Sequence, residues 1–354
     1  MSVKKAYSAH IARNISFLIL GLTALFFLLA YAVTIGAADI SVKDVILAMV
    51  SRFATVETTG FNYAVLWHLR LPRLIMGVIA GSGLALAGVV MQGITRNPLV
   101  SPFTIGISSA AAFGAAIAIM FGVGFVDGGP LLVILNAFVF SLLCAGIVFG
   151  LSNIKGTSPE TLILAGIAIS YLFSALTAVL QFFATEEELM MIVHWTFGSL
   201  TRADWNNIGI SSISFLLIFP FVMYFAWDLN AMMLVDDQTA KSLGINTQKV
   251  RTILMVLSAL LTATITSFTG IIGFVGLVAP HVTRLLIGGD NRFLLPATCI
   301  TGSILVITAD IVGRTLFPPI VLPIGVSLWV PIPVYLWYPK RRIFLEMMIE
   351  ANIV

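Results

Sequence analysis

The sequence predicts an all-α, polytopic membrane protein with about ten transmembrane helices. Hydrophobic residues make up 59% of its 354 residues and charged residues only 10%, whereas soluble globular proteins contain about 25% charged residues. The mean hydropathy is +1.05. The apolar runs are continuous rather than alternating, which excludes the strands of a membrane β-barrel. They are therefore expected to be helices, each with the roughly 20 residues that a membrane crossing requires.

The first apolar run, near 15–36, resembles a signal peptide, because basic residues precede it and Ala-Tyr-Ala at 30–32 resembles a cleavage site. The run is longer than the usual core of a signal peptide, which has about 7–15 residues. Many further apolar runs also follow it. We therefore predict an uncleaved first helix.

Short polar segments separate the remaining apolar runs. The uncharged block 252–283 is too long for one crossing, and Thr269-Gly270 provides a break within it. Dividing the block there gives predicted helices at 15–36, 72–94, 104–122, 131–151, 160–183, 208–227, 251–269, 271–287, 293–314 and 322–338.

The positions of the basic residues predict the orientation of these helices. Ten crossings place both termini on one side of the membrane, and cytoplasmic segments carry an excess of lysine and arginine. Of the 19 such residues, 13 fall on the side of the termini, so both termini are predicted to be cytoplasmic. No repeat or linker divides the chain, and residues 1–354 are expected to form one transmembrane domain. The six basic residues on the outer side are Lys43, Arg52, Arg70, Arg73, Arg202 and Arg314.

Ionisable residues are nearly absent from the predicted spans, which argues against a proton-coupled carrier and against a channel built on charged rings. Sodium coupling through carbonyl and hydroxyl oxygens stays possible. The exception is Asp310 with Arg314 in the ninth span. Their i,i+4 spacing places both side chains on one helix face, and it predicts a structural ion pair.

The chain carries no recognisable set of catalytic or metal-binding residues. It has no G-x-x-x-x-G-K-[ST] loop for nucleotide phosphates, and its two cysteines and four histidines show no metal-ligand spacing. No basic tract indicates nucleic-acid binding. We therefore expect no catalytic residue, no metal and no cofactor on this chain, with any ATP bound by a partner subunit.

Two regions contain a series of motifs. Residues 69–114 include L-R-L-P-R, G-x-x-M-Q, R-N-P-L and G-I-S-S-x-A-A-x-G, and residues 271–325 include G-F-V-G-L-V-A-P-H, A-D-I-V-G-R and L-P-I-G. In this order the motifs resemble the permease subunits of iron-siderophore, haem and vitamin B12 ABC importers, the type II importers. The resemblance covers nearly the whole chain. It weakens after residue 325, where the larger or helix-distorting residues Trp329, Pro331 and Pro333 occupy a stretch that is normally rich in small residues.

The resemblance implies that three arginines dock a soluble binding protein. Arg70 and Arg73 of L-R-L-P-R and Arg314 of A-D-I-V-G-R match an outward-facing basic pocket that receives acidic residues of that protein. Arginine suits this role because it makes bidentate, charge-assisted bonds to carboxylates. Anchoring of lipid phosphates at the helix ends is the alternative.

The resemblance also implies two cytoplasmic features. The loop at about 228–250 contains Ala240-Lys241-Ser242-Leu243-Gly244 and is similar to a coupling segment, a pair of short helices that contacts the ATPase. A solvated loop is the alternative for this segment. Thr157 and Ser158 match the turn that forms the inner gate.

Together these features predict a multi-pass permease of the inner membrane that imports a metal chelate such as a ferric siderophore, haem or cobalamin. The implied partners are a second copy of the chain, two cytoplasmic ATPase subunits, an extracytoplasmic substrate-binding protein and membrane lipid. A stand-alone secondary transporter of a small solute is the competing hypothesis.

Overall fold

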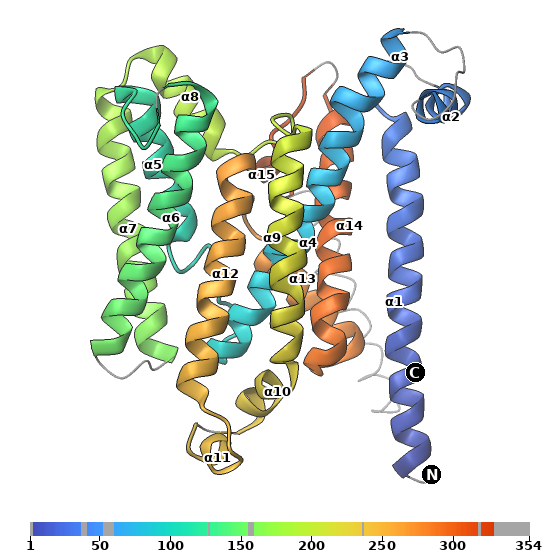
Figure 1. Cartoon of the computed structure of the whole chain (residues 1–354), viewed down its shortest axis with the longest axis vertical. Coiled ribbons are helices and arrows are strands. Elements are labelled where there is room, and N and C mark those ends of the chain that lie inside the picture. Colours follow the sequence, from blue (N-terminus) through green and yellow to red (C-terminus); the bar gives the residue numbers. More distant parts are fainter. Residues whose placement is uncertain are drawn as a thin grey trace, which may run out of the picture.

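The structure is a computed structural model that describes residues 3–36, 41–51, 60–126, 128–154, 159–235, 237–317 and 320–328. Over these ranges the chain is helical and contains no β-strand. Seven of the described helices are long and apolar enough to cross a membrane. The helices stand side by side in one bundle (Figure 1). The predicted all-α, polytopic class is confirmed.

The described spans match the predicted ranges to within four residues at each end, except that α1 begins at Val3, 12 residues before the predicted start. The two shorter apolar helices, α5 and α13, also lie at predicted positions. Of the tenth predicted span, the structure describes only the first turn, α15 (Ile324–Ser327), and its residues 329–338 lie outside the described residues. The nine matched helices are α1 (Val3–Thr34), α4 (Leu71–Thr95), α5 (Ile107–Phe121), α6 (Gly129–Ile154), α7 (Pro159–Phe183), α9 (Trp205–Tyr224), α12 (Thr247–Thr269), α13 (Val275–Ile287) and α14 (Asn291–Thr315).

Short helices between the spans were not predicted from apolar runs. α2 (Val42–Val50) and α8 (Glu186–Thr196) each begin with a capping box, in which a Ser or Thr side chain and an acidic side chain satisfy each other's backbone N–H groups. α3 (Gly60–Ala64) continues through the π-helical turn η1 (Val65–Arg70) into α4. α10 (Ala226–Leu234) and α11 (Asp237–Ser242) precede α12.

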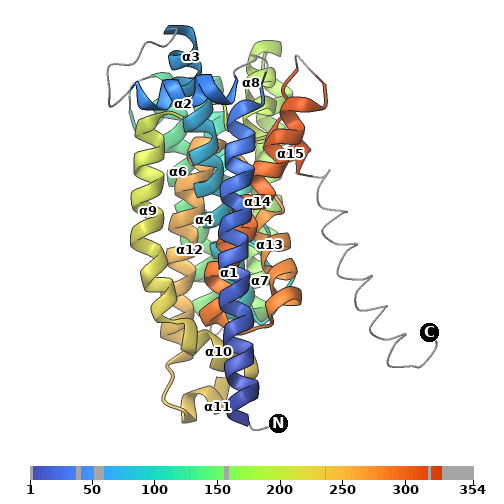
Figure 2. The ribbon, with the colours of Figure 1, turned by 90° about the vertical axis from the view of Figure 1, so that its right-hand side faces the viewer.

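The short helices lie at opposite ends of the bundle. α2, α3 and α8 lie at one end, and α10 and α11 lie at the other, together with the start of α1 (Figures 1 and 2). By the predicted orientation, the end with α10, α11 and the N-terminus is cytoplasmic. We call the opposite end the outer end.

α4 forms the centre of the core. It packs against α14, α12 and α13, and it is buried along almost its whole length. Glycines allow close backbone contacts: a Cβ on Gly81 would lie 2.5 Å from the carbonyl oxygen of Gly302 in α14, and one on Gly88 would collide with the backbone of Gly276 in α13. Small residues permit such approach where lipid provides no hydrophobic drive.

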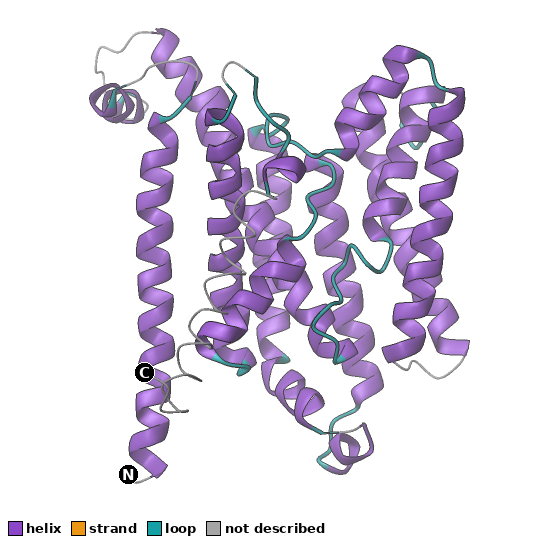
Figure 3. Ribbon diagram, turned by 180° about the vertical axis from the view of Figure 1, so that it is seen from behind, coloured by secondary structure: helices purple, strands orange, loops and turns teal. Residues whose placement is uncertain are grey.

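The predicted break at Thr269-Gly270 is present. α12 ends at Thr269, Gly270 has φ +72°, and α13 begins only at Val275. Because α13 has 13 residues, it spans only about 20 Å. Loop segments therefore lie within the depth of the bundle, as the view from behind shows (Figure 3). Such backbone is tolerated at membrane depth where protein surrounds it.

Candidate functional site

Three arginines from different segments meet at the outer end of the bundle. Arg70 ends η1, Arg73 lies in the first turn of α4, and Arg314 lies in the last turn of α14. The carboxylate of Asp310 lies between two of them. Its Oδ1 accepts a hydrogen bond of 2.7 Å from Arg73 Nε, and its Oδ2 lies 3.0 Å from Arg314 Nε in an ion contact without hydrogen-bond geometry.

Two of these arginines, Arg70 and Arg314, also bind the C-terminal end of α1. Arg70 Nη1 donates to the carbonyl oxygen of Val33, and Arg314 Nη1 donates to that of Ile35 at 2.7 Å. Arg314 also reaches the carbonyl oxygen of Ala32 at 3.3 Å. The last carbonyl groups of a helix lack partners within the helix and carry partial negative charge, so cations stabilise this end.

The structure therefore brings together all three arginines that the sequence singled out, and it adds an intramolecular role for them. Among the described residues, this outer cluster holds three guanidinium groups and one carboxylate. The side chains of Arg73 and Arg314 are 13% and 8% exposed, and that of Asp310 is fully buried.

At the cytoplasmic end, α10 and α11 form the pair of short helices that the resemblance implied. Ala240 of α11 is buried, whereas Lys241, Ser242 and Leu243 are exposed, Leu243 by 66%. Gly244 then turns the chain with φ +88°, and its N–H donates to the carbonyl oxygen of Lys241 at 2.9 Å.

A network of polar contacts attaches these short helices to the spans. Asp237 at the start of α11 pairs with Arg96 at 2.6 Å and with Arg251 at 3.3 Å. The sequence analysis did not predict this network. The one sequence feature that points to it is Arg96, which is the arginine of the R-N-P-L motif.

A second network joins α10 to α14. Asn230 donates to Asp290 at 2.9 Å and accepts from the backbone N–H of Asn291 at 2.7 Å, while Arg292 binds Asp290 and stacks over the ring of Trp227 at 4.3 Å. Burial raises the pKa of Asp290, but the hydrogen bonds from Arg292 and Asn230 outweigh it, so the pKa lies below its ordinary value.

Comparison with known proteins decides the family. The model of the FecCD transport family matches residues 22–339.

This chain belongs to the FecCD transport family.

Relatives of this FecCD permease cover most of both chains. A protein of Methanocaldococcus jannaschii named as an ABC transporter permease is 41% identical, over 92% of this chain and 94% of its own. The hemin transport system permease HmuU of Yersinia pestis is 36% identical, over 82% of this chain and 88% of its own. A solved metal-chelate type ABC transporter in an inward-facing conformation superposes with a TM-score of 0.80 at 31% identity, covering 92% of this chain and 99% of that one. The prediction of a multi-pass membrane ABC permease is confirmed.

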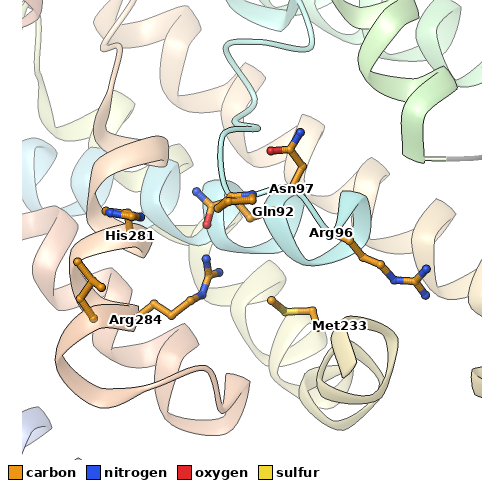
Figure 4. Close-up of a pocket in the computed structure, with 8 residues that line it drawn as sticks. Gln92, Arg96, Asn97, Met233, His281 and Arg284 are labelled. Carbon is orange, nitrogen blue, oxygen red and sulfur yellow. The ribbon is translucent and has the colours of Figure 1, made fainter. Parts of the chain in front are cut away.

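The FecCD permease has a cavity of about 300 Å³ near its cytoplasmic end, with several polar side chains in its lining. Gln92 and Arg284 extend toward the same space from α4 and α13, whereas the guanidinium group of Arg96 points away from them (Figure 4) and donates to Asp237 of α11. Within the described part of the chain, Nε and Nη2 of Arg284 and Oε1 of Gln92 have no hydrogen-bond partner.

A larger, mainly apolar cavity of about 1250 Å³ lies between α6, α8, α9 and α12. At its polar edge Arg202 donates to Nδ1 of His194 at 3.1 Å, and burial lowers the pKa of Arg202. Among the described residues of the permease, no group of three His, Cys, Asp or Glu side chains could hold a metal ion. The predicted gate residues Thr157 and Ser158, like Trp329, Pro331 and Pro333, lie outside the described residues.

Proposed function

We propose that this permease is the transmembrane subunit of a binding-protein-dependent ABC importer for a metal chelate: a ferric siderophore, haem or cobalamin. The observation that carries the proposal is the superposition, over 92% of the chain, on a metal-chelate type ABC transporter. Relatives named for hemin, iron(3+)-hydroxamate and iron(3+) dicitrate transport support the same cargo class. Family membership favours ATP-driven transport over the stand-alone secondary carrier.

The outer cluster is the proposed docking point for the substrate-binding protein. Its guanidinium groups attract acidic side chains and can bind carboxylates in a bidentate manner. Because Arg73 and Arg314 are largely buried and already paired, an incoming carboxylate would share them with Asp310. The binding protein would therefore add a carboxylate to the existing ion pairs without displacing Asp310. A lipid phosphate is the competing ligand for the same charge.

The tip of α11 and the following turn are the proposed ATPase contact. Lys241, Ser242 and Leu243 project from the cytoplasmic end, and Ala240 anchors the helix beneath them. Gly244 sets the direction of the turn. In this proposal the chain itself binds no cofactor, and ATP is hydrolysed by two partner subunits.

The translocation path is proposed to lie between two copies of the chain, with Thr157 and Ser158 at the inner gate. α7 is available for this contact, because it is mostly exposed within one subunit, as α1 and α9 also are, and it carries large apolar side chains along its length, among them Leu164, Tyr171, Leu172 and Phe182. A second copy would cover this face.

A second cargo class has support from one relative. The molybdate import permease MolB of Haemophilus influenzae is 36% identical over 84% of this chain. An oxyanion is therefore the alternative cargo to a chelate.

Uptake into proteoliposomes tests the proposal. The permease is reconstituted with its genomic-neighbour ATPase and binding protein, and uptake of hemin, a ferric hydroxamate, cobalamin and molybdate is measured with and without each partner. We expect ATP-dependent uptake of one chelate that requires all components. Uptake that persists without the ATPase would contradict the importer, and uptake of molybdate alone would establish the oxyanion alternative.

A further inference from the structure

The start of α11 is fixed to the membrane-spanning body by one carboxylate and two arginines. Arg96 Nη2 donates to Asp237 Oδ1 at 2.6 Å, and Arg251 Nη2 donates to both carboxylate oxygens at 3.3 Å. Arg96 follows the last residue of α4, whereas Arg251 lies in the first turns of α12. One side chain of α11 is thus shared by the ends of two different spans.

Each arginine is itself held in place by backbone carbonyl groups. Arg96 adopts the left-handed conformation, with φ 50°, and its Nε donates to the carbonyl oxygen of Met232 in α10. Arg251 is only 4% exposed, and its Nε donates to the carbonyl oxygen of Ile94 in α4 at 3.0 Å. The guanidinium groups are therefore oriented by α4 and α10, which makes the connection to Asp237 directional.

α11 is a short helix at the surface of the bundle. It has six residues, too few to be stable alone in water, and apart from the buried Ala240 its described side chains are half-buried or exposed. An ion-pair interaction of fixed geometry at its first residue therefore contributes to how the helix is oriented relative to α4 and α12.

We propose that Asp237 is a positioning residue that transmits displacement of α11 to α4 and α12 through Arg96 and Arg251. The inference rests on the proposed function, in which the exposed side of α11 contacts the ATPase. Two arginines from separate spans resist displacement in different directions, so a push on α11 moves both span ends together. Without the carboxylate of Asp237, α11 would move while the ends of α4 and α12 stay in place.

The attachment itself can be tested on the purified permease alone. Trypsin cleavage after Lys241 reports how often α11 detaches. Asp237→Asn keeps the side-chain size but removes the charge, and it is expected to accelerate cleavage about tenfold, because local opening governs proteolysis of such segments. Asp237→Glu retains the carboxylate and should recover most of the protection.

Asp228→Asn is the matched control, because Asp228 lies in the neighbouring α10 and forms no ion pair within the described residues. Arg96→Gln is a second variant, expected to change cleavage in the same direction as Asp237→Asn. Equal cleavage rates in Asp237→Asn, Asp228→Asn and the unmodified permease would overturn the proposal.

Transmission is tested in the reconstituted complex, with hemin or a ferric hydroxamate as the probe that the unmodified complex takes up. Asp237→Asn is expected to retain the co-purified ATPase and its hydrolysis rate while the uptake per ATP falls about tenfold. Unchanged uptake per ATP would overturn the inference, and so would loss of the ATPase from the complex, which would make Asp237 a docking support. If the unmodified permease binds no ATPase, the proposed function fails, while the cleavage experiment still reports on the attachment.

Discussion

At the scale of single residues, the outer cluster combines two roles in one set of side chains. Arg73 neutralises a fully buried carboxylate, and Arg70 and Arg314 satisfy the carbonyl groups at the end of α1. The sequence indicated the i,i+4 pair of Asp310 and Arg314, because spacing alone determines it. It did not indicate the contacts with α1, because the acceptors are backbone carbonyl oxygens, which every residue has whatever its side chain.

Substitutions of Arg73, alone and together with Asp310, can separate its structural role from its proposed docking role. Arg73→Gln leaves Asp310 without its hydrogen-bonded partner, and loss of one member of a buried pair costs about 3–5 kcal/mol. We therefore expect a lower thermal midpoint in detergent for Arg73→Gln. The double variant Arg73→Gln/Asp310→Asn removes both charges of this pair and should recover part of the stability, because Arg314 loses its counter-charge but keeps its hydrogen bonds to the end of α1.

The affinity for the cognate binding protein should behave differently. It is expected to fall about tenfold in both variants, since a hydrogen bond to a charged group contributes about 1.5–3 kcal/mol, and surface plasmon resonance would measure the change. Recovery of affinity together with stability in the double variant would show that Arg73 has only a structural role.

The turn after α11 depends on one residue. Gly244 has φ +88°, and a Cβ there would meet no atom within 4 Å, so substitution affects only the backbone. Gly244→Val is expected to lower ATP-driven uptake about tenfold, because β-branched residues avoid this conformation. Gly244→Asn, which tolerates it, is the control. Equal uptake by both variants would contradict a coupling role for this turn.

At the scale of helices, apolar runs predicted the long spans but not the short helices, of which only the pair α10 and α11 was expected, from the family resemblance. Apolar runs gave 72–94 and 160–183 for helices that extend over Leu71–Thr95 and Pro159–Phe183. α8 and α10 are too short to form a span-length pattern. A capping box at Thr185 and Glu188 nevertheless marks the start of α8 in the sequence, and it would have identified that helix.

The backbone contact between α4 and α13 gives a prediction about packing. Gly88→Ala would place a methyl group against the backbone of Gly276, and overpacking of this kind costs about 1–3 kcal/mol. The thermal midpoint of the purified permease is expected to fall. Gly146→Ala on α6, where nothing lies within 4 Å, should leave the midpoint unchanged or raise it, and an equal fall in both variants would contradict the packing argument.

At the scale of the whole molecule, the sequence could identify the class and the family, and it predicted one site at each end of the bundle. Helix ends are where charged residues accumulate in a membrane protein, so the motifs at 70–73 and 240–244 lie at opposite ends. The sequence could not show that Asp237 joins three helices, because the partners are 141 and 14 residues away along the chain.

The proposed pairing of two subunits is tested at the exposed face of α7. Leu172→Arg places a charge where a second copy is expected, and native mass spectrometry should show the loss of the two-permease species. Leu216→Arg on the exposed face of α9 is the control and should retain it. Loss of the pair in both variants, or in neither, would argue against α7 as the interface.

The glycine contacts along α4 have a mechanical consequence. Helices whose backbones touch cannot slide past each other without a collision, so α4, α13 and α14 are expected to tilt together as a single stiff lever. With 25 residues, α4 is about 37 Å long. A small rotation at its cytoplasmic end would therefore displace the arginines at its outer end, on the opposite side of the membrane.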